Sequence, residues 1–146
     1  MKIKDVMNPS FAKIDPGATL REAARQFSTT QASDLMVVDG SGAFAGVLSE
    51  GDLIRAALPR YEEILRDGGS MSDALEMFVD RGRELADEPI LPHVIKDAIT
   101  VSPDDPLLKA ASTMANKQIR RLPVVGGGKL LGTVSRADIC RAVLGS

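Results

Sequence analysis

Apolar residues recur with helical spacing in two separate stretches of the chain. Two sets of four share the spacing i, i+3, i+4, i+7: Leu20, Ala23, Ala24 and Phe27, and Leu107, Ala110, Ala111 and Met114. This spacing places all four side chains of a set on one face of a helix. The pattern therefore predicts two amphipathic helices, each with one face against a core, at matching places in the chain.

Each predicted helix has a start signal. Thr19 with Glu22 three residues later forms a capping box, in which each side chain bonds the backbone N–H of the other residue. In the second copy, Asp105 followed by Pro106 offers an N-cap residue and a proline at the first helical position. Two different caps are expected to begin equivalent helices.

A β-hairpin and a further helix follow each of these helices. The short apolar runs 35–38 and 122–125 are each followed by a glycine-rich turn and a second run that contains Gly46 or Gly132, which predicts a hairpin. Residues 12–14 and 99–101 are the expected first strands. The closing helices are expected to bury two sets of residues: Leu53, Ile54, Ala57 and Leu58, and Ile139, Cys140, Val143 and Leu144. Cys140 is thus interpreted as a small buried hydrophobe.

The chain is therefore a tandem repeat with an insert. Pro103 aligns with Pro16, an offset of 87, and we expect repeats at residues 1–58 and 94–146, joined by a helical insert at 59–93. Neither repeat is long enough to bury a good core alone. The predicted fold is α+β, with two β-α-β-β-α repeats packed around a pseudo-two-fold axis and a pair of clefts between them.

The insert carries helical signals of its own. Ser70 or Ser72 could cap a helix with a partly apolar stripe interrupted at Gly82, and residues 61–65 are expected to extend the preceding helix as far as Gly68 and Gly69. Such an arm could cover a cleft, build a dimer interface or simply pack over the core.

Composition excludes several kinds of protein. With 146 residues, 44% of them hydrophobic, no apolar run of membrane-spanning length and no secretory leader, we expect a soluble, cytoplasmic chain without a membrane partner. One cysteine and one histidine exclude a cysteine-rich or histidine-rich metal site. A net charge of −2 and five aromatic residues disfavour nucleic acid as a partner. The chain lacks a general acid–base set, so it is not expected to be an enzyme.

The two repeats end in one motif, G-h-h-S-x-x-D, where h is apolar. It occurs at Gly46–Asp52 as "GVLSEGD" and at Gly132–Asp138 as "GTVSRAD". With the helices and hairpins in register, the chain resembles a tandem pair of cystathionine β-synthase (CBS) domains outside residues 59–92. This resemblance implies a regulatory module that binds AMP, ADP, ATP, S-adenosylmethionine or an NAD-like ligand as an effector, with no other cofactor.

The Ser-x-x-Asp motif itself suggests ligand chemistry. Ser49 and Ser135 fall where a strand becomes a helix, so nearby backbone N–H groups favour an anion such as phosphate. Asp52 and Asp138 could accept hydrogen bonds from the two hydroxyls of a ribose. The alternative is a capping box, equally favoured for the serines, whereas aspartate in place of the usual glutamate favours the ligand.

The two repeats differ in charge around this motif. Arg120 and Arg121 align with Ser33 and Asp34, and Arg136 aligns with Glu50. Arginines at a cleft mouth suit phosphate oxygens, and the alternative is that they are solvated surface charges.

Three further residues complete the predicted site. In related modules the positions of Thr100 and Lys13 contact the ligand's base or phosphate, and Pro123 offers an apolar surface for adenine. Two functions remain open: a homodimeric sensor of an adenosine-containing ligand that acts on an effector protein not identified by the sequence, and a structural dimerisation module with vestigial clefts.

Overall fold

The first repeat forms a three-stranded sheet with a helix at each end of its hairpin. The computed structural model describes residues 1–66 and 68–145, and its first repeat comprises β1 (Lys13–Ile14), α1 (Leu20–Thr30), β2 (Asp34–Val38), β3 (Phe44–Ser49) and α2 (Glu50–Ala57). β2 lies between β1, which is parallel to it, and β3, which is antiparallel. Both halves of the Thr19–Glu22 capping box are formed, and the predicted face of α1 is buried at Leu20, Ala23 and Phe27.

The second repeat has the same order with a shorter sheet. It comprises α5 (Leu107–Lys117), β4 (Arg121–Gly126), β5 (Lys129–Ser135) and α6 (Arg136–Leu144). The strand expected at 99–101 is reduced to a single parallel bridge between Val101 and Val124. The predicted Asp105 cap is wrong, because α5 begins one residue later with Pro106 as N-cap. The Asp105 carboxylate instead accepts bonds from the Ser102 N–H and from Lys109.

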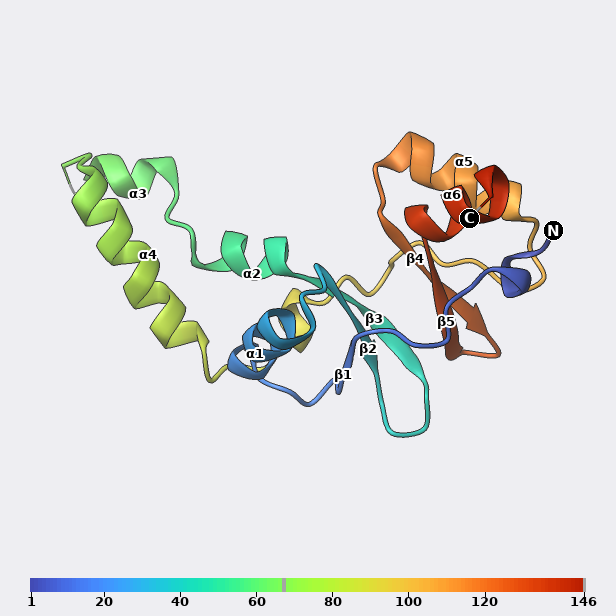
Figure 1. Ribbon diagram of the computed structural model, residues 1–146. Helices are drawn as coiled ribbons and strands as arrows, with labels where there is room; N and C mark the ends of the chain where they lie inside the picture. The colour runs from blue at the N-terminus through green and yellow to red at the C-terminus, as the bar shows by residue number, and fades with distance from the viewer. Residues whose placement is uncertain (67, 146) are drawn as a thin grey trace.

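The two repeats exchange the segments that precede them. Ile3 of η1 (Ile3–Asp5) is buried in the core of the second repeat, and its N–H donates to the Asp105 carbonyl at 2.9 Å. Ile90, just before η2 (Leu91–His93), is buried in the core of the first repeat, and its N–H donates to the Ala18 carbonyl at 3.0 Å. The blue N-terminal segment accordingly lies beside β5 in Figure 1. Each half-sized core is completed by a segment from the neighbouring repeat.

This exchange explains the glycine of the repeated motif. A side chain on Gly46 would lie 2.4 Å from the Ile95 carbonyl oxygen, and one on Gly132 would lie 2.8 Å from the Asn8 carbonyl oxygen. The exchanged segments run against the glycines, with backbone bonds from Ile95 to Val47 and from Asn8 to Thr133. Both glycines therefore make room for backbone.

The tips of the hairpins also join the repeats. The Phe44 N–H donates to the Gly128 carbonyl and the Leu130 N–H donates to the Gly42 carbonyl, both at 3.0 Å. The Lys129 ammonium donates to the Ser41 carbonyl at 2.8 Å. The hairpins thus meet near the pseudo-two-fold axis, and the predicted α+β arrangement of two repeats is confirmed.

The closing helices are much more exposed than predicted. Ala57 is buried, and Leu53 and Ile139 pack partly against the cores. The other predicted core positions are wrong, since five side chains are exposed: Ile54, Leu58, Cys140, Val143 and Leu144. α6 contacts α5 and β5 of its own repeat, and α2 contacts α1, β3, η2 and the insert helix α4 (Met71–Leu85), but these contacts leave the five side chains exposed.

The insert forms a helical arm that projects from the first repeat (Figure 1). The predicted continuation of α2 is wrong: Leu58 is extended, with φ −64° and ψ 132°, as expected for a residue before proline. The arm, residues 59–85, comprises α3 (Tyr61–Arg66) and α4 (Met71–Leu85), and Ser70 caps α4 by accepting the Asp73 N–H. α4 continues through Gly82. Among the described residues, no helix is long and apolar enough to cross a bilayer.

Candidate functional site

A cleft opens between the repeats at the ends of β2 and β4. It is lined by residues 33–34, 47 and 49–51, Arg55, residues 95 and 97–99, and residues 118–123, and its volume is about 650 Å³. We call it the first cleft. Ser49, Arg120, Arg121 and Pro123 from the predicted site all line it. The volume lies in the range of cavities that hold nucleotide-sized ligands.

A second cleft is the pseudo-symmetric counterpart of the first. It is lined by Asn8, residues 10–12, residues 30–34 and Arg121, and its volume is about 490 Å³. Ser33, Asp34 and Arg121 line both clefts. A ligand in either cleft would therefore meet the same two charged side chains, Asp34 and Arg121.

Both Ser-x-x-Asp motifs form complete capping boxes. In the first repeat, Asp52 Oδ2 accepts the Ser49 N–H at 3.1 Å and Ser49 Oγ accepts the Asp52 N–H at 3.2 Å. In the second, Asp138 Oδ2 accepts the Ser135 N–H at 2.9 Å and Ser135 Oγ accepts the Asp138 N–H at 3.1 Å. The capping box, which was the alternative to a ligand site, is thus formed in both repeats, and it occupies one oxygen of each aspartate carboxylate.

An arginine one turn further along holds the other oxygen. Arg55 Nη2 lies 2.8 Å from Asp52 Oδ1, and Arg141 Nη2 lies 2.6 Å from Asp138 Oδ1. Sequence reasoning missed both arginines, although the i, i+3 spacing in "DLIR" and "DICR" was a signal for such a pair. A ligand hydroxyl must therefore share these carboxylates with an arginine or displace it.

The Asp52 carboxyl is held in its charged form. Burial raises its pKa, but the hydrogen bonds from Ser49 and Arg55 together outweigh burial and lower the pKa below its ordinary value. Asp52 is therefore ionised at neutral pH and can accept, but not donate, hydrogen bonds.

The three arginines predicted for the site have different surroundings. Arg120 and Arg121 line the first cleft, and Arg121 Nη1 donates to Thr133 Oγ1 at 2.7 Å. Arg136 instead donates to the carbonyls of Ile119 and Met114, at 2.9 and 3.1 Å. The Met114 carbonyl belongs to the last turns of α5, where basic side chains often donate hydrogen bonds to carbonyls that have no partner in the helix. Arg136 lines neither cleft.

Asp34 stands opposite these arginines. Burial raises the pKa of its carboxyl, Arg121 lowers it by a smaller amount, and Asp52 also raises it. Asp34 and Arg121 are equivalent residues of the two repeats, at the first positions of β2 and β4. The wall shared by the two clefts thus carries one negative and one positive side chain.

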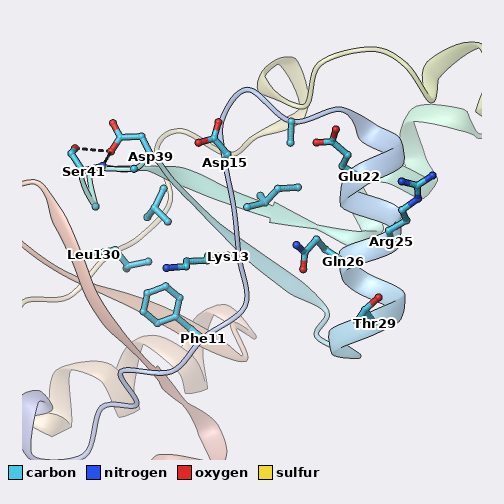
Figure 2. Close-up of a pocket in the computed structure, with 15 residues that line it drawn as sticks. Phe11, Lys13, Asp15, Glu22, Arg25, Gln26, Thr29, Asp39, Ser41 and Leu130 are labelled. Carbon is cyan, nitrogen blue, oxygen red and sulfur yellow. Dashed lines mark hydrogen bonds between the residues drawn. The ribbon is translucent and has the colours of Figure 1, made fainter.

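The remaining predicted residues lie elsewhere. Ser135 and Asp138 take part in the capping box of α6, and Thr100 is exposed beside the second repeat and lines neither cleft. Lys13 lies in a third groove, between α1 and the tip of the first hairpin (Figure 2).

This third groove is larger than either cleft, at about 930 Å³. Figure 2 shows Lys13 beside Phe11 and Leu130, while Glu22, Arg25, Gln26 and Thr29 project from α1 on the opposite wall. Its charged side chains have both signs and are exposed, so the groove favours no particular ligand charge. Within residues 1–66 and 68–145, no three His, Cys, Asp or Glu side chains gather to hold a metal ion.

Comparison with a protein-family model gives a match over both repeats. The model described as CBS domain matches residues 3–59 and 90–145. Two curated relatives cover most of this chain. A 17.7 kDa protein of Acidianus ambivalens is 26% identical over 144 residues, which are 98% of this chain and 73% of that protein. The CBS domain-containing protein YhcV of Bacillus subtilis is 26% identical over 137 residues, which are 94% of this chain and 81% of that protein.

Longer proteins and solved structures extend the comparison. The chain spans 43% of the length of a Methanocaldococcus jannaschii relative, to which it is 25% identical over 144 residues. Among solved structures, CBSX2 in complex with AMP has a TM-score of 0.73 and 22% identity, over 98% of this chain and 96% of that chain. The similarity to the CBSX2 structure establishes the fold.

Proposed function

The chain belongs to the CBS domain family, and we propose that its two repeats form a regulatory module that binds an adenosine-containing ligand in the first cleft. The observation that carries the proposal is the pairing of Arg120 and Arg121 with the exposed apolar side chain of Ile99 along one cleft of about 650 Å³, whereas Pro123, which also lines it, is almost fully buried. A nucleotide needs such a combination, because its phosphate requires fixed cations and its base requires an apolar surface.

The cleft offers a contact for each part of the ligand. The guanidinium groups of Arg120 and Arg121 would bind phosphate oxygens. At the start of α2 the Gly51 N–H could add one bond, since the Glu50 N–H already donates to the Ser33 carbonyl and the Asp52 N–H to Ser49 Oγ. The base would lie against Ile99, because the predicted apolar surface at Pro123 is buried. Asp52 does not itself line the cleft but its partner Arg55 does, so a ribose would reach the carboxylate once the exposed Arg55 side chain swings away, at small cost.

This arrangement predicts that phosphate decides affinity. Calorimetry should give weaker binding of AMP to the Arg120→Ala, Arg121→Ala double variant, by about 10-fold or more, and a flatter salt dependence, because charge-assisted bonds to phosphate are lost. Adenosine should bind poorly to both the native protein and the variant.

Arg25→Ala is the matched control, because Arg25 is exposed on α1 and lines neither cleft. It should leave AMP binding unchanged. An equal loss for adenosine and AMP in the double variant would mean that the two arginines support the fold, and the phosphate assignment would be abandoned. Loss in the Arg25 variant alone would move the site to the third groove.

A second function is favoured by a different observation. Asp52 and Asp138 are already fully engaged by their capping boxes and by Arg55 and Arg141, as expected for a structural dimerisation module that binds no ligand. A thermal-shift panel of adenine ligands separates the two functions, since a ligand at a hundred times its dissociation constant adds about 2.7 kcal/mol of stability. In either case we propose a homodimer that acts in the cytoplasm on an effector protein.

A further inference from the structure

The arm exposes apolar side chains that no other described part of the chain covers. On α4 the exposed fractions are 85% for Met71, 62% for Leu75 and 42% for Val79, residues that follow one another at one-turn intervals. Neither α3 nor α4 buries a single described residue. A 15-residue helix is marginal in water unless its apolar face is packed. α4 contacts α2, and Leu85 packs against the first core, but Met71, Leu75 and Val79 stay exposed and need a covering surface from elsewhere.

The second repeat exposes an apolar face of similar kind. Cys140, Val143 and Leu144 of α6 are exposed, as is Leu108 of α5, and the exposed fraction of Leu144 reaches 81%. In Figure 1 the arm and the second repeat lie at opposite ends of the molecule, while α2, α3, α5 and α6 face the same side. The arm cannot reach its own α6, but the arm of another copy can.

Charge makes the two faces complementary. The arm, residues 59–85, contains seven acidic and four basic side chains, a net charge of −3, whereas α5 and α6 together contain four basic side chains and one acidic side chain, a net charge of +3. Two arms placed together would repel one another, and so would two second repeats. An arm placed on a second repeat would bring opposite charges together, which favours that register over the others.

We propose that the arm of one copy packs on the α5–α6 face of a second copy, in an antiparallel two-fold dimer. A single two-fold rotation applies the contact twice, so both arms and both α6 faces are covered and the assembly closes. Ile54 of α2 and Leu58 just after it are exposed as well, and α2 lies between the arm and the second repeat in Figure 1, so they would extend the same interface. The inference rests on the homodimer proposed above but is independent of ligand binding.

The only cysteine of the chain provides the test. Cys140 lies on the proposed acceptor face and is exposed, so Met71→Cys, Leu75→Cys and Val79→Cys each add one thiol to the arm. A short bismaleimide should convert at least one of these three variants into a covalent dimer within minutes. The same arm substitution combined with Cys140→Ser should lose that product. Ser28→Cys, on the exposed side of α1, is the matched control and should give none.

Each outcome bears on the inference. A covalent dimer that persists in the Cys140→Ser background would mean that arms meet arms, and no product in any of the three variants would mean that the arm does not cover α6; both overturn the proposal. Calorimetry with AMP on the same samples keeps the two proposals apart. A protein that binds AMP without the cross-link loses only this inference, and a cross-linked dimer without AMP binding loses only the proposed ligand function.

Discussion

Removal of the Asp138 carboxylate tests whether the repeated Ser-x-x-Asp motif contributes to the stability of the fold, to ligand binding or to both. Asp138 is 7% exposed and accepts the Ser135 N–H and one guanidinium N–H of Arg141. Asp138→Ala leaves the Ser135 N–H without its partner at the start of α6. Loss of a helix cap costs about 0.5–2 kcal/mol. Loss of the i, i+3 ion pair, in which Arg141 is exposed and Asp138 is buried, adds about 0.3–0.5 kcal/mol.

The free energy of unfolding of Asp138→Ala should therefore fall by about 1–2 kcal/mol. Urea denaturation followed by circular dichroism measures this loss, which moves the midpoint by about 0.5–1 M for a domain of ordinary cooperativity. Asp138→Asn retains one acceptor oxygen for the Ser135 N–H and should lose less than half as much. Asp52→Ala applies the same change to the first repeat and should destabilise to a similar extent, because Asp52 has the same set of partners.

The asparagine variants then isolate the ligand contact. If these carboxylates also hold a ribose, Asp138→Asn or Asp52→Asn should weaken AMP binding by about 1–3 kcal/mol with little loss of stability. An unchanged urea midpoint in Asp138→Ala would refute the energetic role of the capping box. Unchanged AMP affinity in both asparagine variants would refute the ribose contact and leave the motif a helix cap.

Two further substitutions test the packing and the charge of the site. Gly46→Ala should lower the free energy of unfolding by about 2–4 kcal/mol in urea denaturation, because its Cβ would lie 2.4 Å from the Ile95 carbonyl oxygen and the residue has φ +149°. Gly82→Ala, inside α4 and with open space around it, should instead raise the free energy of unfolding by about 0.5–1 kcal/mol. Equal effects of the two substitutions would contradict the close approach at Gly46. Asp34→Asn should stabilise the protein at pH 7 by about 0.5 kcal/mol and tighten AMP binding. Burial raises the pKa of Asp34 above its ordinary 3.8, so the folded state keeps a proton that the unfolded chain releases. The contribution of Asp34 to stability therefore falls as the pH rises from about 4 towards neutrality. A native protein and an Asp34→Asn variant whose urea midpoints keep a constant difference from pH 4 to 7 would contradict this assignment.

Local patterns along the chain were sufficient to predict the repeated elements. The helical spacing from Leu20 to Phe27, the Thr19–Glu22 box and the two hairpins each depend on residues close in sequence, whose geometry is set by backbone sterics and short-range hydrogen bonds. The α+β repeat and the clefts at its ends follow from those elements. Arg120, Arg121, Ser49 and Pro123 could be predicted for the first cleft because they flank the ends of strands that must meet.

Contacts between distant segments decided the rest. The spacing of Ile54, Cys140 and Leu144 identifies an apolar face, but periodicity carries no information on whether another element covers that face, and here none in the described chain does. The same limit applies to Arg136, which binds carbonyls near the end of α5, and to Lys13, which the fold brings to the third groove. Likewise, Ile3 completes the core of the second repeat and Ile90 completes the core of the first only because the repeats are packed together. The sequence by itself determined what each segment could become, whereas the tertiary structure determined which surfaces meet, because burial and charge pairing depend on neighbours that lie far away along the chain.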